Sequence, residues 1–349
     1  MSSLWSKLAP LPFEIVGVQR SAASLEVSPV FTRHTTTLEL LGPDSVGLGE
    51  DVTYETPDQL AFQTASLPNL DGRYTLAEFS ARLDELDLFF GTPPARETSR
   101  DYRRWTFESA ALDLALKQNK LSLAAALGRA FQPVSFVASL GLGRPPSAEP
   151  ILERLATDPG LQFKLDADEA WNAELCSRLA ATGAIRTVDL KGYYTGTPVD
   201  LEASPELYAL VAEHFPDAWI EDPVLDERTL PVLEAHADRL SFDAPIHRVA
   251  DLAQFAIEPR CVNIKPSRSG RVQDLLELYE HCEANSLAMY SGGQFELGVG
   301  RKQVQQLASI FHPDACNDCS PVEYHTSAAG STLPTSPIAA ASNAAGFGA

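Results

Sequence analysis

Charged residues end five consecutive short apolar runs in the second half of the chain: Lys164, Asp189, Glu221, Asp243 and Lys265. The last three are separated by 22 residues each (243 − 221 and 265 − 243), which is the length of one strand–helix repeat. A proline follows each of these three within two residues, and proline indicates where a strand stops because it cannot donate to the sheet ladder. The pattern therefore places these charges at the carboxyl ends of parallel strands, where barrel enzymes build their active sites.

Asp189, Glu221 and Asp243 would lie on neighbouring strands, which are about 4.8 Å apart in a sheet. Three carboxylates at that spacing repel one another unless a cation lies between them. An all-oxygen ligand set is typical of Mg²⁺. The sequence therefore predicts a magnesium site made of these three side chains.

The lysines carry a second signal, because the chain has only seven of them against twenty arginines. Three of the seven, Lys164, Lys191 and Lys265, stand at strand ends. A lysine can act as a base once its pKa is lowered, whereas an arginine effectively cannot. A single charged residue at a strand end is more typical of a helix cap or an ion pair. The prediction that these three lysines are catalytic therefore depends on the order and spacing of all the charged residues at the strand ends.

The elements that must position these side chains fall into two patterns. Residues 1–130 carry short β-like runs followed by the helical patterns Leu76–Phe90 and Trp105–Gln118, which is an α+β order. From Pro133 onward, short apolar runs alternate with amphipathic helices, and this alternation indicates an α/β parallel arrangement. We expect a closed barrel, with a doubly wound open sheet as the alternative. The expected strands are Val134–Leu140, Gln162–Leu165, Thr187–Leu190, Ala218–Ile220, Leu240–Phe242, Cys261–Ile264, Ala288–Tyr290 and a weaker one near Ala315–Asn317.

The composition restricts the partners. The chain is 44% hydrophobic, which is enough for a sizeable core, and its net charge is −20. Such an acidic surface repels phosphate and anionic lipid, so we expect neither nucleic acid nor a membrane as a partner. The sequence has no apolar run long enough for a membrane span and no apolar leader, which predicts a cytoplasmic protein. Cys316-x-x-Cys319 has no second pair, and we interpret it as a turn rather than a zinc or redox site.

The order Lys, Asp, Glu, Asp, Lys resembles the enolase superfamily, in particular the muconate-lactonizing enzyme and o-succinylbenzoate synthase branch of the mandelate racemase/muconate lactonizing enzyme family. Gly47-Leu48-Gly49-Glu50 and the segment Phe107–Asp113 are similar to family segments in the cap and in the helix that leads into the barrel. The resemblance implies a modified (β/α)7β TIM-type barrel with an N-terminal α+β capping domain. Residues 1–130 would be the cap, 131–325 the barrel and 326–349 an uncharged tail, either flexible or docked.

The resemblance also implies roles for the charged residues. Asp189, Glu221 and Asp243 would be the Mg²⁺ ligands, and Lys265 would be the base on the sixth strand. The loop Ala22–Arg33 and the segment Glu50–Pro57 resemble the family's two lids over the barrel mouth. We expect Tyr193 and Tyr194, in the long loop after the third strand, to add to the pocket wall. Relatives are usually homo-oligomers, so the same is expected here.

Two positions depart from the pattern of that branch. The second strand usually carries Lys-x-Lys, and here it carries Lys164-x-Asp166; the third usually carries Asp-x-Asn, and here it carries Asp189-x-Lys191. Residues two apart on a strand face the same way, so Lys191 faces the metal region. Our hypothesis is that Lys191 takes over part of the missing amine's role, and a salt bridge from Lys191 to Asp166 is the alternative. Asp166 itself is rejected as a ligand, because that register leaves one strand unplaced.

The end of the seventh strand, Ser291–Gly298, has no histidine, which argues against the mandelate-racemase-like and acid-sugar-dehydratase branches. The predicted function is a Mg²⁺-dependent lyase or isomerase that abstracts the α-proton of a small carboxylate substrate through a metal-stabilised enediolate, by elimination or cycloisomerisation. The alternatives are a racemase or epimerase of the same superfamily and a non-catalytic member that binds a metal and an organic acid.

Overall fold

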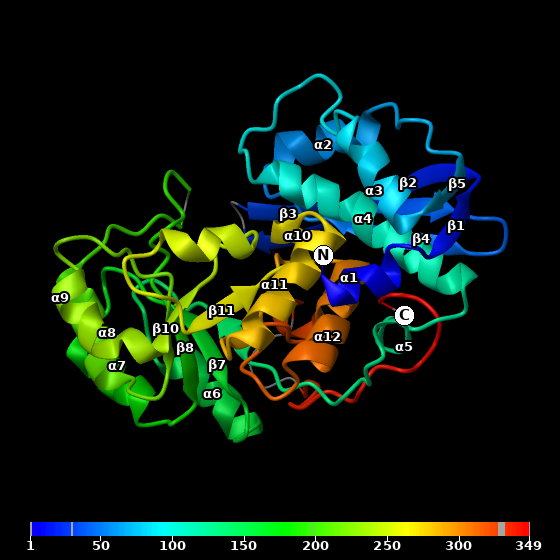
Figure 1. The fold of residues 1–349 in the computed structure, drawn as a ribbon. Coiled ribbons are helices and arrows are strands. Elements are labelled where there is room, and N and C mark those ends of the chain that lie inside the picture. Colours follow the sequence, from blue (N-terminus) through cyan, green and yellow to red (C-terminus); the bar gives the residue numbers. More distant parts are fainter. Residues whose placement is uncertain (1, 29–30, 198, 327–331, 349) are drawn as a thin grey trace.

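The structure is a computed structural model that describes residues 2–28, 31–197, 199–326 and 332–348. The chain folds into two parts, an N-terminal part with antiparallel sheets and a second part with a parallel sheet, and the N-terminal part lies above the parallel strands in Figure 1. The N-terminal part contains a three-stranded antiparallel sheet in the order β2-β3-β4 and a two-stranded sheet β1-β5. Its elements are α1 (Ser3–Leu8), β1 (Pro12–Ile15), β2 (Gly17–Ser28), β3 (Phe31–Leu41), β4 (Val46–Asp51), α2 (Thr56–Thr64), β5 (Gly72–Thr75), α3 (Leu76–Asp84), α4 (Ser99–Gln118) and α5 (Leu123–Leu127).

The second part is a curled parallel sheet of seven strands that follow one another in chain order, from β6 to β12. The strands are β6 (Ala138–Leu140), β7 (Phe163–Asp166), β8 (Ile185–Asp189), β9 (Trp219–Glu221), β10 (Leu240–Phe242), β11 (Cys261–Ile264) and β12 (Ala288–Ser291). The helices between and after them are α6 (Glu149–Thr157), α7 (Ala173–Ala180), α8 (Pro205–His214), α9 (Leu230–Leu233), η1 (Glu234–Arg239), η2 (Val249–Gln254), α10 (Pro266–Ser269), α11 (Val272–Ala284), α12 (Val299–Phe311) and α13 (Glu323–Thr326). The expected alternation of strand and helix is confirmed.

A short segment takes the place of an eighth strand. Asn317 forms a parallel bridge with Phe136, and Asp318 forms one with Gly292. The backbone N–H of Val137 donates to the carbonyl of Asn317 at 2.9 Å. Residues 317–318 therefore join the two outer strands, β12 and β6, as the predicted modified barrel requires.

Two glycines explain how the N-terminal sheet packs on helix α4. A Cβ atom at Gly47 would lie 2.2 Å from the carbonyl oxygen of Ala110, and one at Gly49 would lie 2.0 Å from that of Thr106. Only residues without a side chain permit this approach of strand to helix. The next residue, Glu50, accepts hydrogen bonds from the backbone N–H groups of Leu297, Gly298 and Gly300, and it thereby caps the start of α12.

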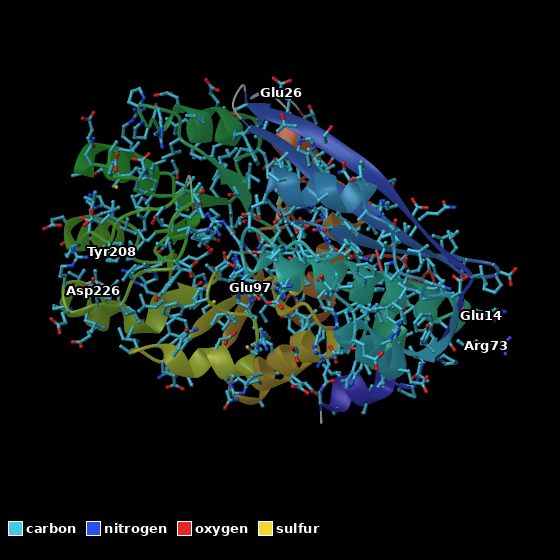
Figure 2. All side chains as sticks on the ribbon, turned by 90° about the horizontal axis from the view of Figure 1, so that it is seen from above. Glu14, Glu26, Arg73, Glu97, Tyr208 and Asp226 are labelled. Carbon is cyan, nitrogen blue, oxygen red and sulfur yellow. The ribbon has the colours of Figure 1, made fainter. Side chains whose placement is uncertain are left out.

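The expectation of a loop at Ala22–Arg33 is wrong. Residues up to Ser28 belong to β2 and residues from Phe31 onward belong to β3, and the two strands form a long hairpin; residues 29 and 30 lie outside the described residues. In Figure 2 this hairpin runs along one side of the molecule, with Glu26 at one end and Glu14 and Arg73 near the other. None of the residues of β2 is fully buried. The strand therefore does not need the regular alternation of apolar and polar residues by which a half-buried strand is predicted from sequence.

The described part of the C-terminal tail is docked. Ile338 and Val134 exchange backbone hydrogen bonds at 2.9 Å in both directions. Phe347 is buried against Trp105 of α4, and its carbonyl accepts from Gln303 of α12. The tail therefore contacts both the N-terminal part and the barrel. No helix in the described ranges is both long and apolar enough to cross a membrane.

Candidate active site

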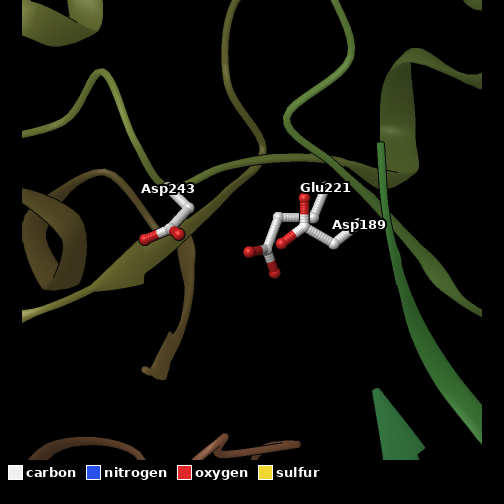
Figure 3. A group of neighbouring side chains, drawn as sticks. All are labelled: Asp189, Glu221 and Asp243. Carbon is white, nitrogen blue, oxygen red and sulfur yellow. The ribbon is translucent and has the colours of Figure 1, made fainter. Parts of the chain in front are cut away.

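Three buried carboxylates meet at the carboxyl ends of β8, β9 and β10. Asp189, Glu221 and Asp243 are fully enclosed, and each offers an oxygen within 4.8 Å of those of the other two. Figure 3 shows the three side chains as neighbours at the ends of these strands. In the described part of the chain, this is the only group of three or more His, Cys, Asp or Glu side chains placed to hold a metal ion. The structure thus brings together the three predicted ligands.

The predicted lysines surround these carboxylates. The amine of Lys164 donates to Glu221 and lies 3.2 Å from Asp189. The amine of Lys265 lies 2.8 Å from Oδ2 of Asp243, on the other side of the trio. Both lysines are buried. Lys164 and Lys265 therefore contact different members of the trio, as their places on the second and sixth strands predict.

Lys191 makes both contacts that its sequence position allowed. Its amine lies 2.5 Å from Oδ2 of Asp189 and 3.0 Å from Oδ1 of Asp166, so the salt bridge to Asp166 is present and the amine also faces the trio. Its φ is +53°, in the left-handed region that a lysine rarely adopts. Strained backbone held by its surroundings is common at functional sites. Asp166 is exposed and is not part of the acidic trio.

The charges shift one another's pKa values. Burial alone would lower the pKa of Lys164, but Glu221 and Asp189 outweigh it and raise that pKa well above its ordinary value. Burial opposes ionisation of Asp189 and Asp243 as well, yet the adjacent cations lower both pKa values, with Lys191 the main partner of Asp189 and Arg268 that of Asp243. The two aspartates are therefore ionised across the physiological range.

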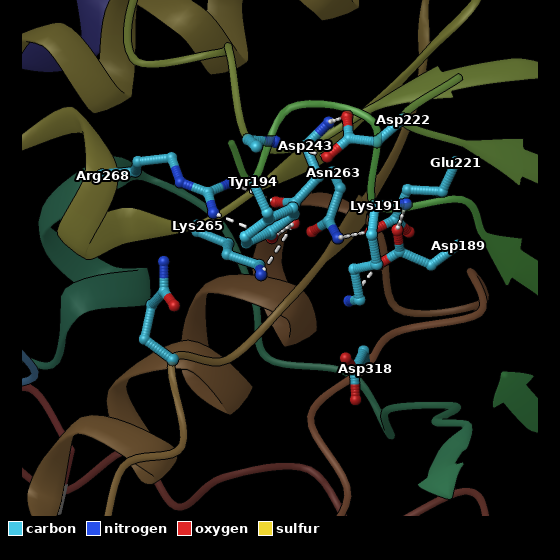
Figure 4. Close-up of polar contacts among 12 residues, drawn as sticks. Asp189, Lys191, Tyr194, Glu221, Asp222, Asp243, Asn263, Lys265, Arg268 and Asp318 are labelled. Carbon is cyan, nitrogen blue, oxygen red and sulfur yellow. Dashed lines mark hydrogen bonds and ion pairs between the residues drawn. The ribbon is translucent and has the colours of Figure 1, made fainter. Parts of the chain in front are cut away.

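Several residues of the site were missed from the sequence. The guanidinium of Arg268 pairs with Asp243, and the hydroxyl of Tyr290 donates to Glu221 from inside the barrel. Asn263, also missed, donates to Glu221 at 3.3 Å (Figure 4). Tyr194, which was expected in the pocket wall, donates to Asp243 at 2.9 Å. Arg268 lies one helical turn after Lys265, in α10, so its position relative to that lysine was the one available signal.

Other glycine, acidic and histidine residues of the barrel have ordinary structural roles. Gly298 is the N-cap residue of α12, where the chain after β12 turns into the helix. Glu296 pairs with Arg301 at 3.0 Å. His312 is buried, with Asn317 at 2.7 Å, and His247 lies 2.8 Å from Asp101. Within the described ranges, none of these residues forms a hydrogen bond or an ion pair with the three carboxylates.

The donor set fits a divalent cation. The network joined by these contacts contains six acidic and four cationic side chains, so the acidic groups outnumber the cationic ones by two. Its members are Asp166, Asp189, Glu221, Asp222, Asp243 and Asp318 against Lys164, Lys191, Lys265 and Arg268. Three converging carboxylates with no nitrogen or sulfur ligand are typical of a Mg²⁺ site.

The chain is similar to two kinds of curated enzymes. It is 27% identical over 290 residues to an N-succinylamino acid racemase of Thermus thermophilus, covering 78% of this chain and 74% of the racemase. It is 28% identical over 211 residues to an o-succinylbenzoate synthase of Enterococcus faecalis, covering 58% of this chain and 55% of the synthase. The chain therefore spans about three quarters of the racemase and about half of the synthase.

Solved structures share the fold. A dipeptide epimerase from Methylococcus capsulatus, complexed with a Mg ion, superposes with a TM-score of 0.66 at 21% identity, covering 87% of this chain and 89% of that chain. A muconate lactonizing enzyme gives 0.63 at 18% identity and 88% coverage of both chains. An enolase superfamily member from Listeria innocua gives 0.62 at 20% identity, covering 89% of this chain and 86% of that chain. These similarities confirm the predicted resemblance to the enolase superfamily and the predicted fold. The relatives whose names state a reaction are enzymes, which agrees with the prediction that this protein is an enzyme.

Family models cover both parts of the chain. Residues 6–126 match the model described as "Domain of unknown function (DUF8230) N-terminal domain". Residues 130–326 match the model described as "Domain of unknown function (DUF8230) C-terminal domain". The chain therefore belongs to the DUF8230 family, and its fold is that of the enolase superfamily.

Proposed function

We propose that this protein is a Mg²⁺-dependent lyase or isomerase that abstracts the α-proton of a small carboxylate substrate. The observation that carries the proposal is the buried trio of Asp189, Glu221 and Asp243 with amines on either side of it. The relatives named as synthase, racemase, epimerase and cycloisomerase support the same class of chemistry.

Asp189, Glu221 and Asp243 would hold the ion through one carboxylate oxygen each. When bound, Mg²⁺ would stabilise the negative charge that develops on the substrate carboxylate as the α-proton leaves. The amines of Lys164, Lys191 and Lys265 contact these carboxylates in the structure and would compete with the ion for them. We therefore expect Lys164, Lys191 and Lys265 to be released toward the substrate when the trio takes a cation.

Lys265 is the proposed base. As a neutral amine it takes the α-proton at Nζ, and the electron pair of the broken C–H bond moves onto the substrate carboxylate to give an enediolate. Its short distance to Asp243 keeps the amine beside the trio. Arg268, bound to the same carboxylate, stays charged throughout and holds Asp243 ionised.

The opposite face of the substrate would meet Lys164 and Lys191. In an elimination or cycloisomerisation, these ammonium groups stabilise the substrate anion or protonate the leaving group. The same placement supports a second candidate, a racemase or epimerase, because an acid–base group on each face is what inversion requires. The similarity to an N-succinylamino acid racemase over 78% of the chain favours keeping this candidate.

Solvent deuterium exchange tests the proposal. The purified protein is incubated in D₂O with Mg²⁺ and a panel of small carboxylic acids, and deuterium at the α-carbon is measured by NMR. We expect exchange with at least one acid, abolished by EDTA and by Glu221→Gln. Exchange with inversion of configuration selects the racemase, and exchange with formation of an alkene or a ring selects the lyase or isomerase. Binding of metal and acid without any exchange across the panel would contradict both and leave the non-catalytic alternative.

A further inference from the structure

Asp222 is a buried carboxylate beside the trio that contributes no oxygen to it. It stands between Glu221 and Pro223 and is fully enclosed. Its Oδ1 accepts from the backbone N–H of Asp243 at 2.7 Å, and its Oδ2 accepts from that of Ala244 at 2.9 Å (Figure 4). Both oxygens of Asp222 therefore bind the backbone that carries the Asp243 side chain.

The backbone of Asp222 also forms hydrogen bonds with residues at the ends of two other strands. Its N–H donates to the carbonyl of Ser241 in β10 at 2.9 Å, and its carbonyl accepts from Gly192, just beyond β8, at 3.0 Å. A Cβ atom at Gly192 would lie 2.7 Å from that carbonyl oxygen. One residue thus connects the ends of β8, β9 and β10, the three strands that carry the trio.

The chemistry of this residue requires a carboxylate. Two backbone N–H groups face its two oxygens, whereas an asparagine would present an NH₂ group to one of these donors. Its φ of +50° is in the left-handed region, where aspartate is tolerated but disfavoured. Burying a carboxylate without a directly paired cation is also unfavourable. A residue that serves only to end β9 has no need for these features.

We propose that Asp222 is a positioning residue for the metal site, which fixes the backbone of Asp243 and the end of β8 so that the three carboxylates converge on one cation. The inference rests on the proposed function, because it assumes that the trio binds Mg²⁺. Residues that orient metal ligands typically contribute about 10–100-fold to metal affinity.

Two substitutions separate positioning from charge. Asp222→Asn replaces the carboxyl group by a neutral amide and breaks one backbone contact. Gly192→Ala keeps the carboxyl group and displaces the same junction, since its new Cβ would also lie 2.6 Å from a methyl carbon of Val224. Asp226→Asn is the matched control, because Asp226 accepts from two backbone N–H groups, those of Arg228 and Thr229, in the same loop but at the outer edge of the barrel (Figure 2).

Metal affinity is measured with Mn²⁺, a spectroscopic substitute for Mg²⁺, and its binding is detected by electron paramagnetic resonance. Circular dichroism verifies that each variant is folded. We expect both site variants to bind about 10–100-fold more weakly than the unchanged protein, with the Asp226→Asn variant unaffected. Deuterium exchange by the site variants should recover at saturating Mg²⁺, which a general folding defect would not allow. If only the Asp222→Asn variant bound Mn²⁺ weakly, the effect would be one of charge, and the positioning role would be overturned. Normal Mn²⁺ binding by both site variants would also overturn the positioning role. A failure of the unchanged protein to bind Mn²⁺ would instead contradict the proposed function.

Discussion

Lys191 is the residue at which this chain departs most clearly from the enzymes that it resembles. Its left-handed backbone would suit an asparagine, the residue usual at this position in the resembling branch, better than a lysine. The amine is held between Asp166 and Asp189. Relative to the branch pattern, an amine has been lost at position 166 and gained at position 191. We interpret this as a relocation of the amine from the second strand to the third.

Replacing Lys191 by asparagine should separate catalysis from metal binding. We expect deuterium exchange to fall by about 10²–10⁴-fold, the usual contribution of a positioned acid–base group. Mg²⁺ binding should persist or tighten, because a competing cation has left Asp189. The exposed lysine of α12, Lys302, provides the control as Lys302→Asn. Unchanged exchange by the Lys191→Asn variant would remove Lys191 from the proposed catalytic set.

The sequence predicted those contacts of the candidate site that follow from position along the chain. Asp189, Glu221 and Asp243 were predicted to lie together because the strand ends of a parallel sheet meet at one edge. Asp222 was not found, since its role depends on a left-handed backbone that turns its side chain toward the next strand. Tyr290 was not found because it reaches Glu221 across the barrel interior, and a single sequence gives no distance between non-adjacent strands.

At the scale of elements, the segment that replaces the eighth strand depends on one side chain. The carboxamide of Asn317 accepts from the N–H of Ser291 and donates to the carbonyl of Ser135, so it connects β12 to the segment before β6. The same oxygen contacts Nδ1 of His312 at 2.7 Å, which requires that this nitrogen carry the proton. Burial lowers the pKa of His312 to about 4, so the ring is neutral in the folded protein near neutral pH.

This histidine should make the fold sensitive to acid. Its pKa is below the ordinary value of 6.5, so the unfolded chain binds the proton first as the pH falls. Stability should therefore be fully present above pH 6.5 and decline toward pH 4, by on the order of 3 kcal/mol from this group. Urea unfolding of the unchanged protein and of His312→Gln across this range measures the difference. Parallel pH profiles for the two proteins would contradict the assignment.

Prediction of the elements succeeded where strands are buried. Leu240–Phe242 and Cys261–Ile264 were predicted with their observed bounds, because both strands are short, fully buried and mostly apolar segments between turn signals. The hairpin of β2 and β3 was missed at its outer half, where exposed polar residues dominate. Cross-strand pairing rather than burial makes that segment a strand, and pairing is not visible in a single sequence.

At the scale of the whole molecule, buried contacts connect the N-terminal part to the barrel. Glu50 caps α12, and Arg33 donates to the carbonyls of Gln294 and Phe295 after β12. The tail adds Phe347, whose N–H donates to Asp113 of α4 and whose carbonyl accepts from Gln303 of α12. The N-terminal part is thereby fixed relative to the barrel.

Truncating the Phe347 side chain should weaken this connection. Phe347 is 1% exposed, and replacing such a residue with alanine typically costs about 3–5 kcal/mol of unfolding free energy. We expect faster amide hydrogen exchange in α4 and α12 and little change in β8–β10. Phe347→Leu, which retains most of the apolar volume, serves as the control. Equal exchange rates in all three proteins would show that the tail contributes nothing to the connection.

A crystal structure of the protein grown with Mg²⁺ would show whether the three carboxylates bind the ion. We expect one ion bound by an oxygen from each of Asp189, Glu221 and Asp243 at about 2.0–2.1 Å. We also expect the amines of Lys164 and Lys265 to have moved away from the carboxylates that they contact in the present structure. Carboxylates that remain paired with these amines, with no ion between them at saturating Mg²⁺, would contradict the proposed metal site.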